Sequence, residues 1–213
     1  MLCGLDEAGR GPLAGPLYAA AVVLPEEFPQ DGLGGAGGQG LSLLRDSKAL
    51  PPRQRARAAE WIRRHALRFH VLSVSVEEIN ERGIGWANRE VFRRLIEQVE
   101  ADLYVVDGRV LPPVSEKRRR SVTCMVRADA TVPAVMAASI LAKVARDECM
   151  ASLDRRYPVY GWRCNMGYPT SGHLDAIVRY GLTPYHRIAF ALTALATWAR
   201  RRLGEEGAWN GVV

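Results

Sequence analysis

Short apolar runs of strand length in the first part of the chain, followed by longer helical patterns, constrain its fold most strongly. Glycines, prolines and acids bound the early runs, as expected where strands alternate with turns. We expect strands over 1–5, 17–24, 69–76, 103–106 and 122–126. We expect helices over 53–68, 86–100, 133–154, 171–180 and 188–203. Strands early and helices late predict an α/β fold, with a mixed central sheet flanked by helices and a helical C-terminal extension.

The 213 residues contain no linker long enough to separate independent domains. Hydrophobic residues make up 48% and charged residues 24%, which excludes disordered and collagen-like chains. We therefore expect one domain over 1–213, in which residues 171–203 form a C-terminal helical portion. Residues 31–40 include six glycines, and we expect a flexible loop there rather than a phosphate cradle.

The composition also indicates where the protein works. No apolar stretch approaches the roughly 18 residues of a membrane span, and acids at positions 6 and 7 come too early for a signal peptide. We expect a soluble, cytoplasmic protein, monomeric by default. The four cysteines have neither zinc nor disulfide-framework spacing. A net charge of +6 suits a polyanionic partner without requiring one.

Four acids stand where predicted strands or turns end. Asp6 and Glu7 follow the first run, Asp107 follows 103–106, and Asp129 lies in the turn after 122–126. If these acids converge, their mutual repulsion requires a divalent cation. Carboxylates without His or Cys select Mg²⁺ or Mn²⁺, and two such ions are the usual device for displacement at a phosphodiester. Ordinary turn or capping acids are the alternative interpretation of this pattern.

The segment 6–16 reads DEAGRGPLAGP and closely resembles the opening motif of the type 2 ribonucleases H, the ribonuclease HII family. Five more blocks resemble the same family in the same order. They are 46–48, 105–108, 137–147, 167–170 and 186–187. The resemblance runs from residue 4 to about 190 and implies a ribonuclease H-like fold.

The resemblance implies a metal-dependent endoribonuclease. Such an enzyme hydrolyses RNA phosphodiesters in RNA–DNA hybrids and at ribonucleotides embedded in duplex DNA, which removes misincorporated ribonucleotides and RNA primers. The cleaved ends would be a 5′-phosphate and a 3′-hydroxyl. The residues that match the family's metal-binding, catalytic carboxylates are Asp6, Glu7, Asp107 and Asp129. Two Mg²⁺ or Mn²⁺ ions are implied, and we choose Asp6 as their shared ligand.

The resemblance also implies substrate contacts. Gly9, Arg10 and Gly11 match the segment that reads the 2′-hydroxyl through its backbone, as glycines allow close approach to a sugar. Tyr168 matches the tyrosine that packs on the deoxyribose after the ribonucleotide, and Lys48 would contact a nearby phosphate. Each has a structural alternative: the segment 9–11 would be only a tight turn, Tyr168 a core residue and Lys48 a solvated surface residue.

Several matched residues receive no role from the sequence. Lys143 and Asp147 are spaced to pair on one helix face, while His173 and Arg187 stay unassigned. Ala128 stands where many relatives have glycine. The basic run 117–120 is either a nucleic-acid contact or a solvated loop.

Two other classes of function fit the sequence less well. A non-catalytic hybrid-binding protein predicts the loss of a carboxylate, yet all four are present. A phosphate-loop enzyme needs Gly-Lys before Ser or Thr, and the glycine-rich segment has no lysine. The sequence leaves open the preferred substrate, the physiological ion and a possible sliding-clamp partner, for which the tail 204–213 has no obvious binding box.

Overall fold

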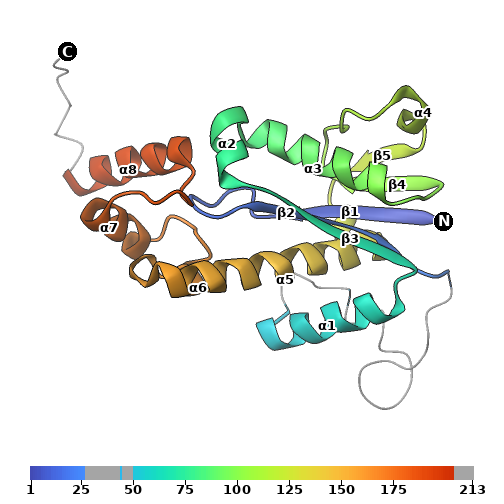
Figure 1. Ribbon diagram of the computed structural model, residues 1–213, viewed down its shortest axis with the longest axis horizontal. Coiled ribbons are helices and arrows are strands. Elements are labelled where there is room, and N and C mark those ends of the chain that lie inside the picture. The colour runs from blue at the N-terminus through green and yellow to red at the C-terminus, as the bar shows by residue number, and fades with distance from the viewer. Residues whose placement is uncertain (27–43, 45–49, 204–213) are drawn as a thin grey trace.

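A five-stranded mixed sheet lies at the centre of the computed structural model, which describes residues 1–26, 44 and 50–203 (Figure 1). Its spatial order is β3-β2-β1-β4-β5. The strands are β1 (Leu2–Ala8), β2 (Leu17–Val23), β3 (Arg68–Val74), β4 (Leu103–Asp107) and β5 (Val122–Met125). β2 is antiparallel to β1 and β3, whereas β4 is parallel to β1 and β5. The expected mixed sheet is confirmed.

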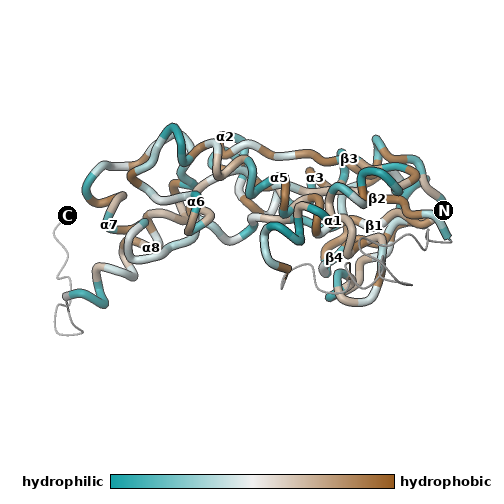
Figure 2. The backbone as a smooth tube through the Cα atoms, turned by 90° about the horizontal axis from the view of Figure 1, so that it is seen from below, coloured by the Kyte–Doolittle hydropathy of each residue, from teal (hydrophilic) through white to brown (hydrophobic). Residues whose placement is uncertain are grey.

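Helices cover both faces of this sheet and extend beyond one end of it (Figure 1). The α-helices are α1 (Pro52–His65), α2 (Val76–Arg82), α3 (Ile84–Gln98), α4 (Glu116–Arg119), α5 (Pro133–Arg156), α6 (Trp162–Asn165), α7 (Ser171–Tyr180) and α8 (Ile188–Leu203). Two 3₁₀ turns, η1 (Ala128–Ala130) and η2 (Pro158–Tyr160), complete the described elements. Figure 2 shows α7 and α8 at the end of the molecule opposite the N-terminus and the strands β1, β2 and β4.

Alternation along the central strands separates two cores. Cys3 and Leu5 of β1 face a cluster that α3 completes with Val91 and Leu95. The opposite face of the sheet packs against α1 and α5, as Ala20 of β2 does. Because α5 is buried on most of its circumference, its sequence is rich in small and apolar residues rather than amphipathic.

A third cluster joins the sheet to the C-terminal helices. Leu13 and Ala14, from the loop between β1 and β2, pack with Met150, Trp162 and Leu174. The loop therefore belongs to the same packed unit as α5, α6 and α7.

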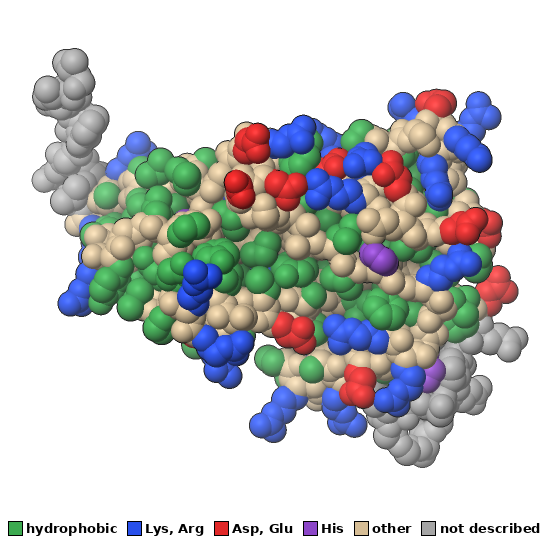
Figure 3. All heavy atoms as spheres, in the orientation of Figure 1, with side chains coloured by type: hydrophobic (Ala, Val, Ile, Leu, Met, Phe, Trp, Pro, Cys, Tyr) green, Lys and Arg blue, Asp and Glu red, His purple; other side chains and the backbone are tan. Residues whose placement is uncertain are grey.

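An ion pair joins α2 to α3 on the face drawn in Figure 3, where acidic and basic side chains alternate. Arg94 contacts Glu78 of α2 and Glu90 of its own helix. Helix α2 was not expected from the sequence. Its signal is a capping box, in which the Ser75 hydroxyl accepts from the Glu78 N–H and the Glu78 carboxylate accepts from the Ser75 N–H.

The first strand is longer than expected. Parallel pairing with β4 stops at Leu5, but antiparallel pairing with β2 continues to Ala8. Asp6 and Glu7 therefore lie within β1 rather than after it. The glycine-rich segment 31–40 and the tail 204–213 lie outside the described residues.

The basic run 117–120 begins in the short helix α4, which precedes β5. It is consequently at the opposite end of β5 from Asp129. Arg118 contacts the Tyr104 hydroxyl group. In the described ranges, no helix is long and apolar enough to cross a bilayer.

At Gly4 the backbones of β1 and α5 approach each other closely. A Cβ atom added there would lie 2.2 Å from backbone atoms of Ala134 and Val135. We expect Gly4→Ala to lower the free energy of unfolding by about 3 kcal/mol, because strand and helix must move apart. Thermal or urea unfolding measures this change. The matched control is Gly85→Ala in α3, whose Cβ would meet nothing nearer than 4.0 Å and should change stability by less than about 1 kcal/mol.

Candidate active site

Parallel pairing brings two of the predicted carboxylates side by side. Leu5 of β1 is in register with Val106 of β4, so the next residues, Asp6 and Asp107, lie at the same level. Both strands present their carboxyl ends at this edge of the sheet. The side chains of residues that follow parallel strands meet there.

Asp129 reaches the same edge from β5. The chain turns after β5 at Arg127, whose φ of 59° is left-handed, and enters η1. The Ala128 N–H donates to Asp107 Oδ1 at 2.8 Å, which ties this turn to β4. Ala128 is fully buried and has no left-handed φ, so its methyl group is compatible with the local backbone.

Asp6 is the most perturbed acid of the group. Its side chain is 3% exposed, and burial together with the neighbouring Glu7 and Asp107 charges raises its pKa to about 7. The Glu7 N–H donates to Asp6 Oδ1 at 2.8 Å, and the Ser139 hydroxyl of α5 also favours the charged form. These two hydrogen-bond donors lower the pKa of Asp6, but by less than burial raises it.

Glu7 lies toward α3. Burial raises the pKa of Glu7, and so does the Asp107 charge, whereas the Arg10 guanidinium and the Asn88 amide lower it. Asn88 comes from α3 and was not singled out from the sequence. The one sequence signal for Asn88 is that it lies at helical spacing from the buried Val91 and Phe92, on the side of α3 that faces the sheet.

The acids as arranged are suited to a cation but do not yet enclose one. Among the described residues, no three Asp, Glu, His or Cys side chains are grouped closely enough to hold a metal ion as they stand. Asp6 Oδ2, however, is buried and has no hydrogen-bond partner in that part of the chain. An unpartnered carboxylate oxygen beside two more acids fits a hard divalent cation, because the cation would supply the missing partner and neutralise the repulsion.

The predicted Gly9-Arg10-Gly11 segment forms the start of the loop after β1. Its carbonyl groups are held by the buried Arg187, whose Nη2 donates to Gly9 O at 2.6 Å and whose Nη1 donates to Arg10 O at 3.0 Å. Gly9 has a φ of 95°, and a Cβ there would lie 2.0 Å from Arg146 Nε. Only glycine fits this position.

Tyr168 lies beside the same loop. Its side chain is 47% exposed, and a Cβ added at Gly11 would be 3.8 Å from its Cε1 atom. The His173 ring holds the Tyr168 carbonyl through Nδ1 at 2.9 Å. The core alternative is therefore wrong for Tyr168, whose ring is available at the surface.

His173 is part of a buried aromatic cluster, away from the acids. Trp162 Nε1 donates to His173 Nε2 at 3.0 Å, and His186 Nε2 lies 3.2 Å from the same atom. Burial lowers the pKa of both histidines, that of His186 to about 4. The pair is neutral at pH 7 and serves packing, with His173 also supporting the Tyr168 backbone.

Lys48 lies outside the described residues. A separate polar network joins α1 to α5, in which Arg55 donates to Leu50 O and to Asp147 Oδ2, both at 2.9 Å. Lys143 pairs with Asp147, as their spacing on the helix allows.

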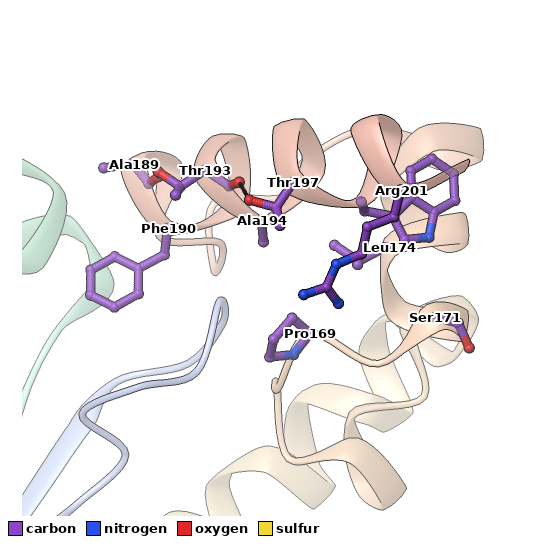
Figure 4. Close-up of a pocket in the computed structure, with 10 residues that line it drawn as sticks. Pro169, Ser171, Leu174, Ala189, Phe190, Thr193, Ala194, Thr197 and Arg201 are labelled. Atoms are coloured by element: carbon purple, nitrogen blue, oxygen red, sulfur yellow. Dashed lines mark hydrogen bonds between the residues drawn. The ribbon is translucent and has the colours of Figure 1, made fainter. Parts of the chain in front are cut away.

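A groove of about 710 Å³ lies between α7 and α8, beginning at Pro169 next to Tyr168 (Figure 4). Its wall is mostly apolar, and Arg201 extends over it. The Thr193 and Thr197 hydroxyls donate to carbonyls one turn earlier, at 2.8 and 2.9 Å. With no acid among its lining residues, this groove is unsuited to metal-dependent hydrolysis.

The raised pKa of Asp6 makes the metal-free protein sensitive to pH. The unfolded carboxyl ionises near 3.8 and the folded one near 7, so ionisation opposes folding and stability falls as pH rises between these values. We expect Asp6→Asn to raise the free energy of unfolding at pH 8 by on the order of 4 kcal/mol in a chelating buffer. Unfolding as a function of pH measures this gain.

Divalent ions provide the control for this prediction. Adding Mn²⁺ should increase the unfolding temperature of the wild type by clearly more than that of Asp6→Asn. Equal shifts in both proteins would contradict a role for Asp6 in holding the ion.

Comparison with known proteins identifies the family. The family model described as Ribonuclease HII matches residues 3–193. Ribonuclease HII of Ralstonia nicotianae is 44% identical over 196 residues, which cover 90% of this chain and 77% of that protein.

Solved structures agree with this match. The PCNA:RNase HII complex from Archaeoglobus fulgidus has a TM-score of 0.71 at 28% identity, covering 90% of this chain and 94% of that one. Bst-RNase HIII in complex with Mn²⁺ shares the fold, with a TM-score of 0.66 at 18% identity over 94% of this chain and 70% of that one. This chain therefore belongs to the ribonuclease HII family, whose members are metal-dependent ribonuclease H endonucleases acting on RNA–DNA substrates.

Proposed function

We propose that this protein hydrolyses RNA phosphodiesters in RNA–DNA hybrids and at ribonucleotides embedded in duplex DNA, leaving 5′-phosphate and 3′-hydroxyl ends. The observation that carries the proposal is continuity along β1 and its loop. Asp6 and Glu7 lie beside Asp107, and the Gly9-Arg10-Gly11 segment follows at once. A backbone suited to reading a sugar thus adjoins carboxylates suited to phosphodiester chemistry.

The metal ligands would be Asp6, Glu7, Asp107 and Asp129, with Asp6 shared between two Mg²⁺ or Mn²⁺ ions. When bound, the two ions would supply activation of the attacking water and stabilisation of the leaving 3′ oxygen. The unpartnered Oδ2 of Asp6 supports its shared role. Ser139 and the Glu7 N–H orient the Asp6 carboxylate, and the Ala128 N–H orients that of Asp107.

Substrate selection would depend on the loop after β1 and on Tyr168. Backbone groups of Gly9, Arg10 and Gly11 would contact the 2′-hydroxyl, which distinguishes RNA from DNA. The exposed Tyr168 ring next to Gly11 would pack on the following deoxyribose, where an extra hydroxyl would disturb the contact. Lys48 would bind a neighbouring phosphate.

The remaining expectations are also proposals. We infer that the chain acts as one catalytic domain, because the loop after β1 packs into the C-terminal helices. A monomer working in the cytoplasm fits that inference. A sliding-clamp partner is suggested by the complexed relative from Archaeoglobus fulgidus.

The proposed chemistry is tested with Asp107→Asn. We expect cleavage of a DNA duplex carrying one ribonucleotide, and of an RNA–DNA hybrid, to fall at least about 100-fold, because a metal ligand is lost. Cleavage of labelled substrates with Mg²⁺, Mn²⁺ or chelator measures this. Binding to the hybrid and thermal unfolding should be largely retained.

The matched control is Asp102→Asn. Asp102 precedes β4 at its other end and pairs with the N-terminal amine, so the variant removes the same charge far from the site. Its activity should equal that of the wild type. Absence of cleavage by the wild type with any ion would instead favour a non-catalytic hybrid-binding protein.

Tyr168→Ala tests recognition of the junction. We expect cleavage at a single embedded ribonucleotide to fall roughly tenfold more than cleavage within a uniform hybrid, because only the former presents a deoxyribose to the ring. The ratio of kcat/KM on the two substrates measures this selectivity. Tyr180→Ala is the control, since Tyr180 is similarly exposed at the far end of α7. Equal losses on both substrates would contradict the role of Tyr168.

A further inference from the structure

Arg187 lies immediately before α8 and holds three carbonyl groups of the loop after β1. In addition to the bonds to Gly9 and Arg10, its Nε and Nη2 donate to Gly15 O at 3.0 and 2.8 Å. The guanidinium thus contacts both ends of the loop at once. No role was assigned to Arg187 from its sequence context.

The direction of these carbonyls determines where the neighbouring N–H groups point. No peptide bond of the described chain is cis, and in a trans peptide the C=O of one residue is opposite the N–H of the next. With the Gly9 and Arg10 carbonyls turned toward Arg187, the N–H groups of Arg10 and Gly11 point away from it. Arg10 and Gly11 are exposed, and within the described residues neither N–H has a hydrogen-bond acceptor. Two adjacent donors are therefore presented at the surface.

The burial of Arg187 indicates that this arrangement has a purpose beyond packing. Its side chain is 0% exposed and, in the described part of the chain, forms no ion pair with a carboxylate. Arg146, a second buried cation, lies near enough to disfavour its charge. Burying a cation without a counterion is expensive. Four hydrogen bonds to carbonyl groups and the Phe190 ring, whose centroid lies 5.7 Å from the guanidinium carbon, offset this cost. An apolar side chain would fill the space at lower free-energy cost.

The backbone of Arg187 is held as firmly as its side chain. Its N–H donates to Leu13 O at 2.7 Å. Asn80 of α2 bridges the two neighbouring peptides, since its Nδ2 donates to His186 O at 3.0 Å and its Oδ1 accepts from Ile188 N–H at 2.9 Å. Arg187 is thereby positioned relative to α2 and the loop after β1, not only relative to α8.

We propose that Arg187 is a specificity-positioning residue, which turns the Gly9 and Arg10 peptides so that the N–H groups of Arg10 and Gly11 donate to the 2′-oxygen of the ribonucleotide. The proposal rests on the proposed function and adds the residue that makes the backbone selective. Arg187 does not touch the substrate. It acts by donating hydrogen bonds to the Gly9 and Arg10 carbonyl groups, which would otherwise face the sugar.

Arg187→Lys tests the proposal, because a lysine keeps the charge but cannot hold three carbonyls in a fixed planar geometry. The measurement is the ratio of two dissociation constants in EDTA, for an all-DNA duplex and for the same duplex with one ribonucleotide. The ratio is the dissociation constant for the all-DNA duplex divided by that for the duplex with one ribonucleotide. Loss of about one well-oriented hydrogen bond predicts a roughly tenfold lower ratio in the variant. If the wild-type ratio is below ten, we expect the variant's ratio to fall to one. Affinity for the all-DNA duplex should change by less than about twofold.

A control variant separates selectivity from simple destabilisation. Tyr160→Phe removes a part-buried hydrogen bond of 2.8 Å to Gly181 O and keeps the aromatic ring, which belongs to the same cluster as Leu13 and Ala14. It should lower the unfolding temperature and leave the ratio unchanged. If Arg187→Lys does not fold, Asn80→Ala replaces it, because Asn80 is exposed and acts only on the peptides that flank Arg187. It should lower the ratio in the same direction.

The outcomes distinguish this inference from the proposed function. A wild-type protein that binds both duplexes equally would overturn the reading of the 2′-hydroxyl itself. If the wild type discriminates and the folded Arg187→Lys variant, or Asn80→Ala in its place, keeps the full ratio, then Arg187 is only a packing residue. A lowered ratio in Tyr160→Phe would also overturn the assignment, because general loosening would then explain the effect.

Discussion

Two buried guanidinium groups hold the loop after β1 against the C-terminal helices, and the arrangement of the site depends on this contact. Arg187 binds carbonyls at both ends of the loop, while Arg146 of α5 donates to Ala14 O and Met166 O at 3.1 and 3.0 Å. The loop continues directly from the strand that carries Asp6 and Glu7. One set of hydrogen bonds therefore relates the sheet edge, the exposed N–H groups and Tyr168.

The site concentrates unfavourable electrostatics on both sides of β1's end. Within the described ranges, Asp6 is a buried acid with an unpartnered oxygen, and the buried Arg187 and Arg146 form no ion pair with a carboxylate. Native proteins keep such groups where function requires them, because packing alone would favour apolar replacements. A divalent ion would relieve the repulsion among the acids. The stability of the free protein is consequently lower than its core would allow.

Much of the fold was predictable from local signals. The run 103–106 followed by Asp107 indicated a strand end, and the Lys143–Asp147 pair was expected from helical spacing. The extent of β1 was not, because pairing with β2 beyond Leu5 depends on a partner strand. Helix α2 was missed although Ser75 and Glu78 carried its capping signal.

The sequence by itself determined the chemistry available to this protein, namely four carboxylates, a glycine-flanked arginine and a tyrosine in a family order, because residue identities and their spacing require no partner. Only the tertiary structure decided which groups act together. The parallel register of β1 and β4 places Asp6 beside Asp107. Packing of the C-terminal helices against the loop after β1 places Arg187 next to the Gly9-Arg10-Gly11 segment, although Arg187 is 177 positions from Arg10. Contacts at that separation have no local signal, since they arise from packing of the whole chain rather than from the periodicity of any segment.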